Sequence, residues 1–350
     1  MRIAITGATG NVGTSVLNAL VDDPAVDSIV GIARRLPTSR VPKTTWVAAD
    51  VTESDLVPIL SGADVVIHLA WLIQPSRDLE LVRRTNVDGS IRVFEAAAAA
   101  KVPALVYASS VGAYSPGPKE GTVDESWPAR GIATSFYSRH KGEVEAVLDE
   151  FEPAHPEMRI VRLRPALIFK KESGAEVRRL FFGPFLPNRI LRRGWIPVIP
   201  NIPGLRFQAV HSLDVGEAYR LAAMQDVRGA FNITADPILD FPTIAEILGA
   251  RVVRVSPRVV RAGANITWKL RLQPTPPGWV DMAMQAPLMD GTRATTELGW
   301  KPTRTSIDAV KDLIDGLRES AGLDTPPLDP HAGGRLRHRE ITSGVGSRQM

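Results

Sequence analysis

Three glycines stand between the first apolar segment of the chain and its first helix-like segment. Residues 2–6 read RIAIT, and TGATGNVG then places Gly7, Gly10 and Gly13 in the spacing GxxGxxG. Such glycines permit a tight turn, close approach of the backbone to a pyrophosphate, and close packing of the helix on the strand. The N-terminus of the following helix offers N–H groups to the phosphates. This strand, turn and helix together predict a nucleotide-binding α/β fold.

Short apolar segments alternate with helical segments as far as residue 170. Strands that are apolar throughout and alternate with helices indicate a parallel sheet covered on both faces. Further strands are predicted at 28–33, 44–49, 63–70, 104–110 and 158–169. The alternation of strands and helices then ends, because residues 183–204 hold five prolines and three glycines, which interrupt regular structure. The prediction is an α/β chain with three parts: a Rossmann-type doubly wound parallel sheet over 1–170, a smaller substrate lobe interleaved with it over 171–322, and a disordered basic tail over 323–350.

The composition argues against several classes of protein. The 350 residues include no cysteine, which excludes disulfides and thiolate metal sites and favours a reducing compartment, the cytoplasm. No apolar run approaches the roughly 20 residues of a membrane span, and MRIAITGATG does not resemble a signal peptide, so no membrane partner is expected. Four arginines and one glutamate in residues 331–350 contribute +3 of the net charge of +4. A nucleic-acid partner is therefore not expected, since its basic footprint would lie on the fold.

The end of the second predicted strand bears on the choice of nucleotide. A dinucleotide fold selecting NAD usually carries an acid there, which hydrogen-bonds the ribose 2′-hydroxyl. This chain instead reads GIARR, with Arg34 and Arg35 after Ala33. Guanidinium groups suit a 2′-phosphate, so NADP is slightly favoured over NAD, the alternative being that both arginines are solvated loop residues. Asp50, after the third strand, could reach the adenine amino group or could be an ordinary acidic turn residue.

Tyr137 and Lys141 lie four residues apart in SFYSRHKGEVEAVLDEFE, and residues at this spacing are neighbours on a helix. A free tyrosine has a pKa of about 10, and a nearby ammonium together with a positive nicotinamide ring would lower it. Tyr137 could then exchange a proton with a substrate hydroxyl while hydride is transferred. Arg139 and His140 are expected to face solvent.

The motifs TGATGNVG, VIHLA, NVDG, YASSVGAY, YSRHK, LRP and LGWKP follow one another along residues 1–320. This ordered set resembles the extended short-chain dehydrogenase/reductases, a family of NAD(P)-dependent sugar epimerases, dehydratases and reductases. The resemblance implies a doubly wound sheet with a smaller substrate lobe. It also implies a catalytic set of Ser110, Tyr137 and Lys141, in which Ser110 hydrogen-bonds the substrate oxygen and Lys141 also holds the nicotinamide ribose.

The resemblance further points to the residues that bind the cofactor. Asn86 is expected to tie its helix to the cofactor region, whereas His68 is interpreted as a packed strand-end residue. Asp214 is interpreted as a helix N-cap, with His211 beside it structural or at the rim of the pocket. The expected cofactor-binding residues are Gly7, Gly10, Asn11, Val12, Gly13, Arg34, Arg35, Asp50, Val51, Leu69, Ala70, Asn86, Tyr137, Lys141 and Pro165.

The segment from Val177 to Leu213 holds six arginines and no carboxylate. A cluster of guanidinium groups suits an anionic group such as a nucleotide-sugar diphosphate. Arg179, Arg192 and Arg193 are therefore expected to bind substrate, the alternative being a basic lobe that only aids solubility or packs on a partner. No cluster of His, Asp and Glu has the spacing of metal ligands, so no metal is expected.

Three functions remain open at this point. The first is a nucleotide-sugar epimerase or dehydratase with a tightly held cofactor, and the second is an NADP-dependent reductase of a small carbonyl compound. The third, a non-catalytic nucleotide-sensing module, is weakened by the intact set of serine, tyrosine and lysine. A homodimer is expected from the family pattern, in which two long helices pair, here about residues 78–100 and 135–151.

Overall fold

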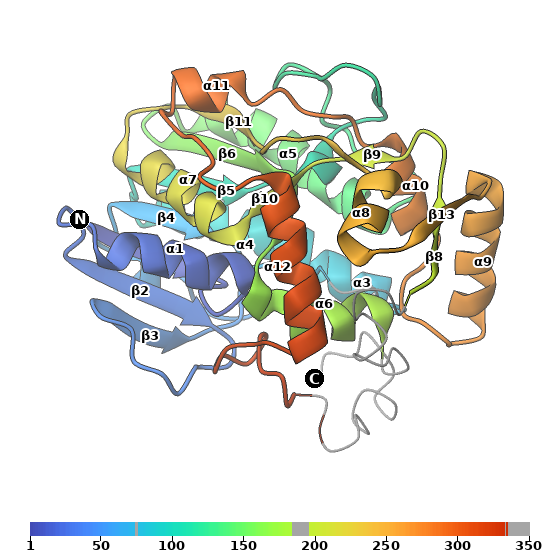
Figure 1. Cartoon of the computed structure of the whole chain (residues 1–350). Helices are drawn as coiled ribbons and strands as arrows, with labels where there is room; N and C mark the ends of the chain where they lie inside the picture. The colour runs from blue at the N-terminus through green and yellow to red at the C-terminus, as the bar shows by residue number, and fades with distance from the viewer. Residues whose placement is uncertain (74–75, 184–195, 333, 335–350) are drawn as a thin grey trace.

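A seven-stranded sheet forms the centre of the protein in the computed structural model, which describes residues 1–73, 76–183, 196–332 and 334 (Figure 1). The strand order is β11-β6-β5-β4-β1-β2-β3, and every neighbouring pair is parallel. The strands are β1 (Arg2–Thr6), β2 (Ser28–Ala33), β3 (Thr44–Ala48), β4 (Val65–His68), β5 (Ala104–Ala108), β6 (Arg159–Pro165) and β11 (Gly229–Ile233). The order reverses between β1 and β4, which confirms the predicted doubly wound sheet.

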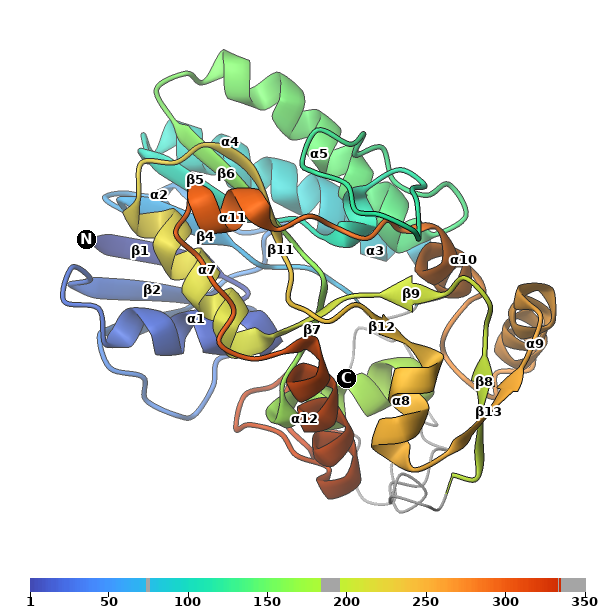
Figure 2. The same cartoon turned by 45° about the horizontal axis from the view of Figure 1, so that its top comes forward.

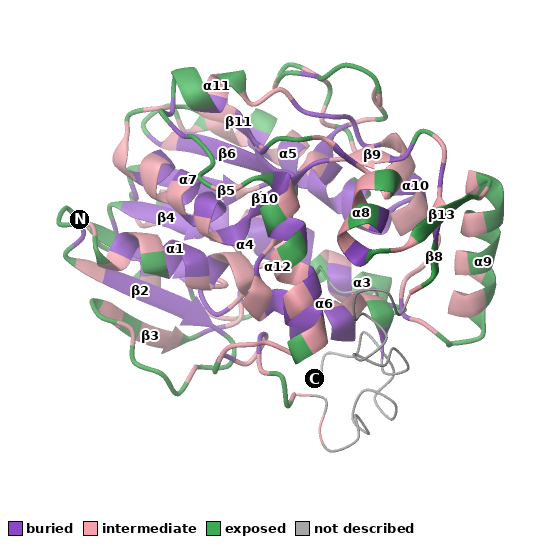
Figure 3. Ribbon diagram, in the orientation of Figure 1, coloured by how far each residue is buried: buried purple, intermediate pink, exposed green. Residues whose placement is uncertain are grey.

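Helices cover both faces of this sheet, as Figures 2 and 3 show. In β1, Ile3 and Ile5 pack in one apolar core and Ala4 packs in the other, because successive side chains point to opposite faces. The first face is covered by α1 (Asn11–Val21) and α7 (Ser212–Met224). The second is covered by α2 (Val57–Leu60), α4 (Gly89–Ala99) and α5 (Phe136–Ala154). The α3 helix (Leu79–Arg83) and the π-helix η1 (Arg84–Asp88) precede α4.

The predicted strand 158–169 is two strands in the structure. β6 ends at Pro165, and β7 (Leu167–Phe169) leaves the main sheet to pair with β10 (Ala209–His211). Proline has no N–H to donate to a ladder, which explains why the strand ends there. The main sheet then takes β11 from beyond residue 170.

A smaller lobe lies past the carboxyl ends of the strands (Figure 2). Its own core includes Leu239, Leu248 and Ile314. The remaining elements are η2 (Val111–Ala113), η3 (Lys171–Ser173), α6 (Gly174–Val177), η4 (Arg178–Phe182), β8 (Val198–Asn201), β9 (Arg206–Phe207), β12 (Leu239–Asp240), α8 (Phe241–Leu248), β13 (Arg251–Arg254), α9 (Pro257–Lys269), α10 (Gly278–Gln285), α11 (Thr292–Thr296) and α12 (Ser306–Glu319). The limits 1–170 and 171–322 stay predictions.

The expectation of a disordered tail from residue 323 is wrong for residues 323–332. Leu328 is fully buried, and the Thr325 Oγ1 donates a hydrogen bond of 2.9 Å to the Thr9 carbonyl. The Gly- and Arg-rich composition that suggested disorder begins only at residue 331, and 335–350 lie outside the described residues. Within the described ranges, no helix combines the length and apolar character that crossing a bilayer requires.

Candidate active site

The glycine turn is packed against the end of β4. Gly7 has φ +72°, and a Cβ on it would lie 2.8 Å from the backbone nitrogen of Ala70. A Cβ on Gly13 would lie 2.4 Å from the Gly7 carbonyl oxygen, so α1 packs directly on the turn. A Cβ on Gly10 would lie 3.5 Å from the Gly7 carbonyl oxygen, which is an ordinary contact distance. The backbone at the start of α1 is therefore not covered by other described groups at this position. This open helix N-terminus fits a pyrophosphate.

Asn11 and the end of β4 border the same turn. The Leu69 N–H donates to the Thr6 carbonyl over 3.0 Å, and the Asn11 side-chain amide donates to the Ile168 carbonyl over 3.4 Å. The Asn11 Oδ1 is buried without a hydrogen-bond partner among the described residues. Since buried acceptors rarely lack a partner, this oxygen marks a place for a donor on a ligand. The residues around this cradle are Gly7, Gly10, Asn11, Val12, Gly13, Leu69 and Ala70.

Arg34 and Arg35 are exposed after the end of β2. Partial burial, followed by the positive charges of Arg34 and Arg179, lowers the pKa of the Arg35 guanidinium. Three guanidinium groups from two distant segments therefore act on one another here. Such a concentration of positive charge suits a phosphate.

Three further residues expected at the cofactor, Asp50, Val51 and Asn86, contact other parts of the protein. The Asp50 Oδ1 accepts hydrogen bonds from the Thr52 N–H at 2.9 Å and the Thr52 hydroxyl at 2.7 Å, so Asp50 shapes its own turn. Val51 is buried in the core. The Asn86 side chain bonds both backbone groups of Leu72, at 2.7 and 3.0 Å, and so joins η1 to the segment after β4.

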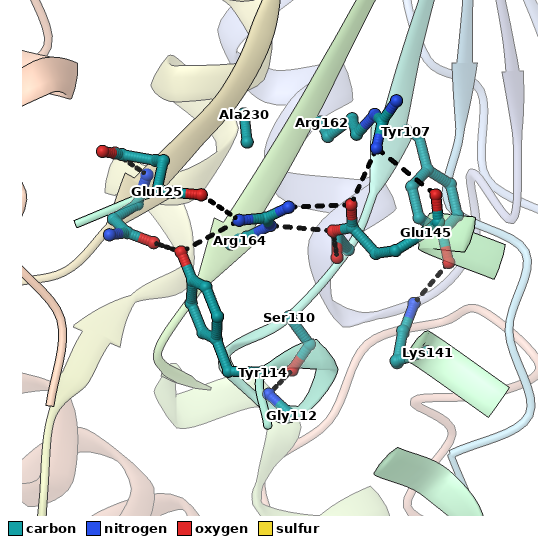
Figure 4. Close-up of polar contacts among 12 residues, drawn as sticks. Tyr107, Ser110, Gly112, Tyr114, Glu125, Lys141, Glu145, Arg162, Arg164 and Ala230 are labelled. Atoms are coloured by element: carbon teal, nitrogen blue, oxygen red, sulfur yellow. Dashed lines mark hydrogen bonds and ion pairs between the residues drawn. The ribbon is translucent and has the colours of Figure 1, made fainter. Parts of the chain in front are cut away.

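Ser110 and Tyr137 meet beside η2. Tyr137 lies in the first turn of α5, which Ser135 caps by accepting a hydrogen bond from the Ser138 N–H. The Tyr137 hydroxyl lies close enough to Ser110 for this serine to affect its pKa. The Ser110 Oγ accepts a hydrogen bond from the Gly112 N–H at 3.0 Å (Figure 4). A Cβ on Gly112 would lie 2.8 Å from the Tyr137 ring, so only glycine leaves the ring its place.

Lys141 lies one turn further along α5 and is 3% exposed. Its Nζ donates to the Ala108 carbonyl at 2.5 Å and lies 3.5 Å from the Tyr107 hydroxyl. Burial lowers the pKa of Lys141 well below its usual range, against the charge of Glu145. The structure thus gathers Ser110, Tyr137 and Lys141 at the end of β5. Pro165 closes the neighbouring β6 at the same edge of the sheet.

The expected lowering of the Tyr137 pKa rests on Lys141 together with a bound nicotinamide, and the protein by itself shifts this pKa upward. Burial raises it to about 12, and the hydrogen bond with Ser110 only partly opposes this. The spacing reveals the ammonium one turn away but gives no measure of how far the phenol is desolvated.

Two tryptophans flank Tyr137, and neither was predicted from the sequence. The ring centroids of Trp71 and Trp279 lie 6.1 and 5.2 Å from that of Tyr137. The Lys141 Nζ lies 3.4 Å from the centroid of the Trp71 ring. Both indole N–H groups are buried without an acceptor among the described residues. Trp71 directly follows VIHLA and could have been noticed there, whereas no local signal marks Trp279 on α10.

A buried ion network lies behind the catalytic helix and was not predicted either (Figure 4). Arg164 binds Glu145 through two hydrogen bonds, Nε to Oε1 at 2.8 Å and one terminal nitrogen to Oε2 at 2.9 Å. Arg162 reaches Oε2 at 3.2 Å, and the Ser109 hydroxyl donates to Oε1 at 2.5 Å. Burial alone would raise the pKa of Glu145, but Arg164 and Arg162 lower it to about 2. Glu145 stands one helical turn after Lys141, so this network anchors the helix that carries the site.

Two expectations about neighbouring side chains are wrong. His140 is buried, not solvent-facing, because it packs at 5.9 Å against Phe136 on its own helix; this burial lowers its pKa to about 4. Asp214 does not cap α7, which begins at Ser212 with His211 as its N-cap. Arg139 is exposed as expected.

Asp214 and His68 have structural roles instead. The Asp214 carboxylate accepts hydrogen bonds from the Thr303 hydroxyl at 2.5 Å and the Arg304 N–H at 3.0 Å. His68 is buried, as predicted, between Thr6 at 2.6 Å and Ser90 at 2.9 Å, and burial lowers its pKa to about 3. It is therefore neutral at physiological pH.

Of the three arginines expected to bind substrate, the structure describes one, Arg179. Arg179 is buried and donates to the Pro327 carbonyl at 2.6 Å and the Asp329 carbonyl at 3.3 Å. Arg192 and Arg193 lie outside the described residues. Phe181, on the same η4 turn as Arg179, packs at 5.0 Å against Trp279, which in turn lies beside Tyr137.

Comparison with known proteins bears on the same site. An uncharacterised protein of Mycobacterium tuberculosis is 23% identical over 348 residues, covering 94% of this chain and 86% of the relative. The UDP-glucose 4-epimerase of Yersinia enterocolitica is 24% identical over 342 residues, covering 89% and 96%. Among solved structures, MoeE5 in complex with UDP-glucose and NAD superposes with a TM-score of 0.67 at 23% identity, covering 91% of this chain and 99% of that one. The family model described as the NAD dependent epimerase/dehydratase family matches residues 3–233, which include the glycine turn, Ser110, Tyr137 and Lys141. The chain belongs to the NAD dependent epimerase/dehydratase family.

Proposed function

We propose that the protein is an epimerase or dehydratase of a nucleotide sugar, with NAD or NADP as its hydride carrier. The observation that carries the proposal is the meeting of Tyr137 with Ser110 beneath Trp71 and Trp279, one turn from Lys141. The Yersinia relative and MoeE5, named above for UDP-glucose chemistry and binding, support a sugar nucleotide as substrate.

Each residue of the site has its own role in the proposed reaction. A bound nicotinamide supplies the hydride acceptor or donor. Tyr137 exchanges the proton of the reacting hydroxyl, and Ser110 donates a hydrogen bond to the same oxygen as charge develops on it. With a pKa of about 12, Tyr137 carries its proton at neutral pH, which is the form that donates to a carbonyl oxygen. Lys141 holds the ribose, and the two indoles exclude water from the reacting atoms.

The test is direct. Freshly purified protein is denatured and the released nucleotide identified by mass spectrometry, and native protein is then incubated with UDP- and dTDP-hexoses while the sugar protons are followed by NMR. Co-purified NAD and conversion of a sugar nucleotide support the proposal. A protein that carries no nucleotide, converts none of these sugars and oxidises NADPH with a small ketone contradicts it.

The reductase remains the second candidate because of one observation. Arg34 and Arg35 follow β2, and the positive charge of Arg179 also acts on Arg35. A 2′-phosphate is the group of NADP that such a cluster would bind, and NADPH is the usual hydride donor of a reductase that releases its cofactor each turnover.

Replacing Arg34 and Arg35 together with alanine is expected to weaken NADPH binding more than tenfold and to leave NADH binding almost unchanged. Charge-assisted hydrogen bonds contribute roughly 1.5–3 kcal/mol each, and about 1.4 kcal/mol is a factor of ten. Each nucleotide is titrated against the wild type and the double variant at fixed salt. Arg40→Ala, an exposed arginine of the same loop, is the matched control. If the affinities for both nucleotides change by the same small factor, or if the wild type already binds NADH more tightly, the arginines do not bind the 2′-phosphate.

We also propose a homodimer formed by α5 and by the α3–η1–α4 segment, the long helices that pair in the family. The Ala-rich end of α4 allows close approach of a second helix. Multi-angle light scattering at micromolar concentration is expected to give twice the chain mass of 38.0 kDa, and a mass of one chain contradicts the dimer. We place the enzyme in the cytoplasm, the reducing compartment that the lack of cysteine favours.

A further inference from the structure

Helix α9 stands at the outer edge of the small lobe and has no buried residue (Figures 1 and 3). Val259, Gly263, Ile266 and its C-cap Leu270 follow one another at intervals of four, three and four, so they share one face. The exposed fractions of Val259, Ile266 and Leu270 are 62%, 56% and 64%. A Cβ on Gly263 would have no described atom within 4 Å. These four residues form the α9 stripe, an apolar face turned away from the protein.

The charge around the stripe has a single sign. No Asp or Glu occurs between Ile247 and Val280. The exposed cations in that interval are Arg251, Arg254, Arg258, Arg261, Lys269 and Arg271. Arg261 forms an ion pair with Asp281 at 2.7 Å, whereas the structure shows no ion pair of the other five with a described carboxylate. Arg258 and Lys269 are eleven residues apart, three helical turns, so both lie on one flank of the stripe.

We propose that α9 binds the surface of an anionic membrane, with the α9 stripe in the boundary between headgroups and acyl chains and the flanking cations on lipid phosphates. A helix that lies in this interface has an apolar face and Lys or Arg beside it, which is the arrangement here. The sequence-based expectation of no membrane partner considered only segments that span or enter a membrane, and peripheral binding needs neither.

The pattern fits a lipid surface better than the two other partners that could cover it. A nucleic acid would engage the cations through its phosphates but would leave the aliphatic stripe in water. The core of a protein interface is depleted in charged residues, whereas here Arg258 and Lys269, which have no described ion pair, lie directly beside the apolar face. The two long helices proposed for the dimer, α4 and α5, lie away from α9 (Figure 2).

Vesicle flotation tests the apolar half of the proposal. Full-length protein is mixed with vesicles of phosphatidylcholine alone or of equal parts phosphatidylcholine and phosphatidylglycerol. The wild type is expected to float with the anionic vesicles only, and Ile266→Glu to lose at least tenfold in affinity. Val57→Glu makes a similar change at a 37% exposed apolar residue of α2, far from α9, and is expected to bind like the wild type. The proposal is overturned if the wild type does not float with anionic vesicles, or if both variants lose the same amount of vesicle affinity.

A charge variant tests the electrostatic half. Arg258→Gln with Lys269→Gln is expected to weaken binding about thirtyfold, because each cation near an anionic surface contributes roughly a factor of five. Lys101→Gln with Lys301→Gln removes the same charge at exposed sites elsewhere and is expected to leave binding unchanged. Circular dichroism checks that every variant is folded. Equal weakening by both pairs, or a wild type that shifts duplex DNA but does not float with vesicles, overturns the proposal.

Discussion

Replacing Tyr137 with phenylalanine is expected to lower turnover by about 10²–10⁴-fold, the usual contribution of general acid–base catalysis. The change deletes only the hydroxyl beside Ser110, and the ring keeps its place against Gly112 and Trp279. Nucleotide affinity should therefore stay within a few-fold of wild type. The measurements are kcat with the sugar nucleotide that the substrate panel identifies, and a nucleotide titration of both proteins.

Tyr114→Phe provides the matched control for that experiment. Tyr114 is also fully buried, but its hydroxyl donates to the Asn232 side chain at 2.6 Å in the core. This variant is expected to lose stability while its kcat stays close to that of the wild type. If Tyr137→Phe retains full turnover, or if both variants lose it equally, Tyr137 is not the proton-transferring group.

The second large effect is on stability. Glu145→Ala is expected to lower the free energy of unfolding by about 3–5 kcal/mol, because removing one partner of a buried ion pair leaves the other charge uncompensated. Arg162 keeps Asp149 at 2.6 Å and Glu152 at 3.0 Å, whereas Glu145 is the one described carboxylate that the structure shows within ion-pair distance of Arg164. Urea denaturation of the wild type and the variant measures the difference.

Asp149→Ala is the control for Glu145→Ala. Its carboxylate also contacts Arg162, but its side chain is 56% exposed, and exposed ion pairs contribute about 0–1 kcal/mol. A loss in Glu145→Ala no larger than in Asp149→Ala would show that the buried pair does not support the fold.

The same carboxylate predicts a pH dependence with a definite sign. The pKa of Glu145 is lowered from 4.5 to about 2 in the folded protein. Its contribution to stability is therefore fully present above pH 4.5 and is lost as the pH falls through the interval down to about 2. The Glu145→Ala variant should lack this part of the acid sensitivity, and wild type and variant should converge in stability at the acid end.

The parts of the fold and site that the sequence predicted are those set by neighbours along the chain. A turn in which a strand and a helix N-terminus both approach a phosphate requires glycine at particular positions. The spacing of Gly7, Gly10 and Gly13 was therefore enough to predict this turn. Continuous apolar runs identified the strands of a sheet buried on both faces. The spacing of Tyr137 and Lys141 predicted that they are neighbours on one helix, because i and i+4 are neighbours on any helix.

The tertiary structure decided what depends on packing between distant segments. It brought Trp279 to Tyr137 and Arg164 to Glu145, pairs that no local spacing relates. It also decided the burial of Tyr137, which raises the pKa of this side chain in the protein itself. A helical repeat says which residues are adjacent, but desolvation depends on every element that covers a group. The charge state of a buried side chain is therefore set by the whole fold, and the sequence alone cannot supply it.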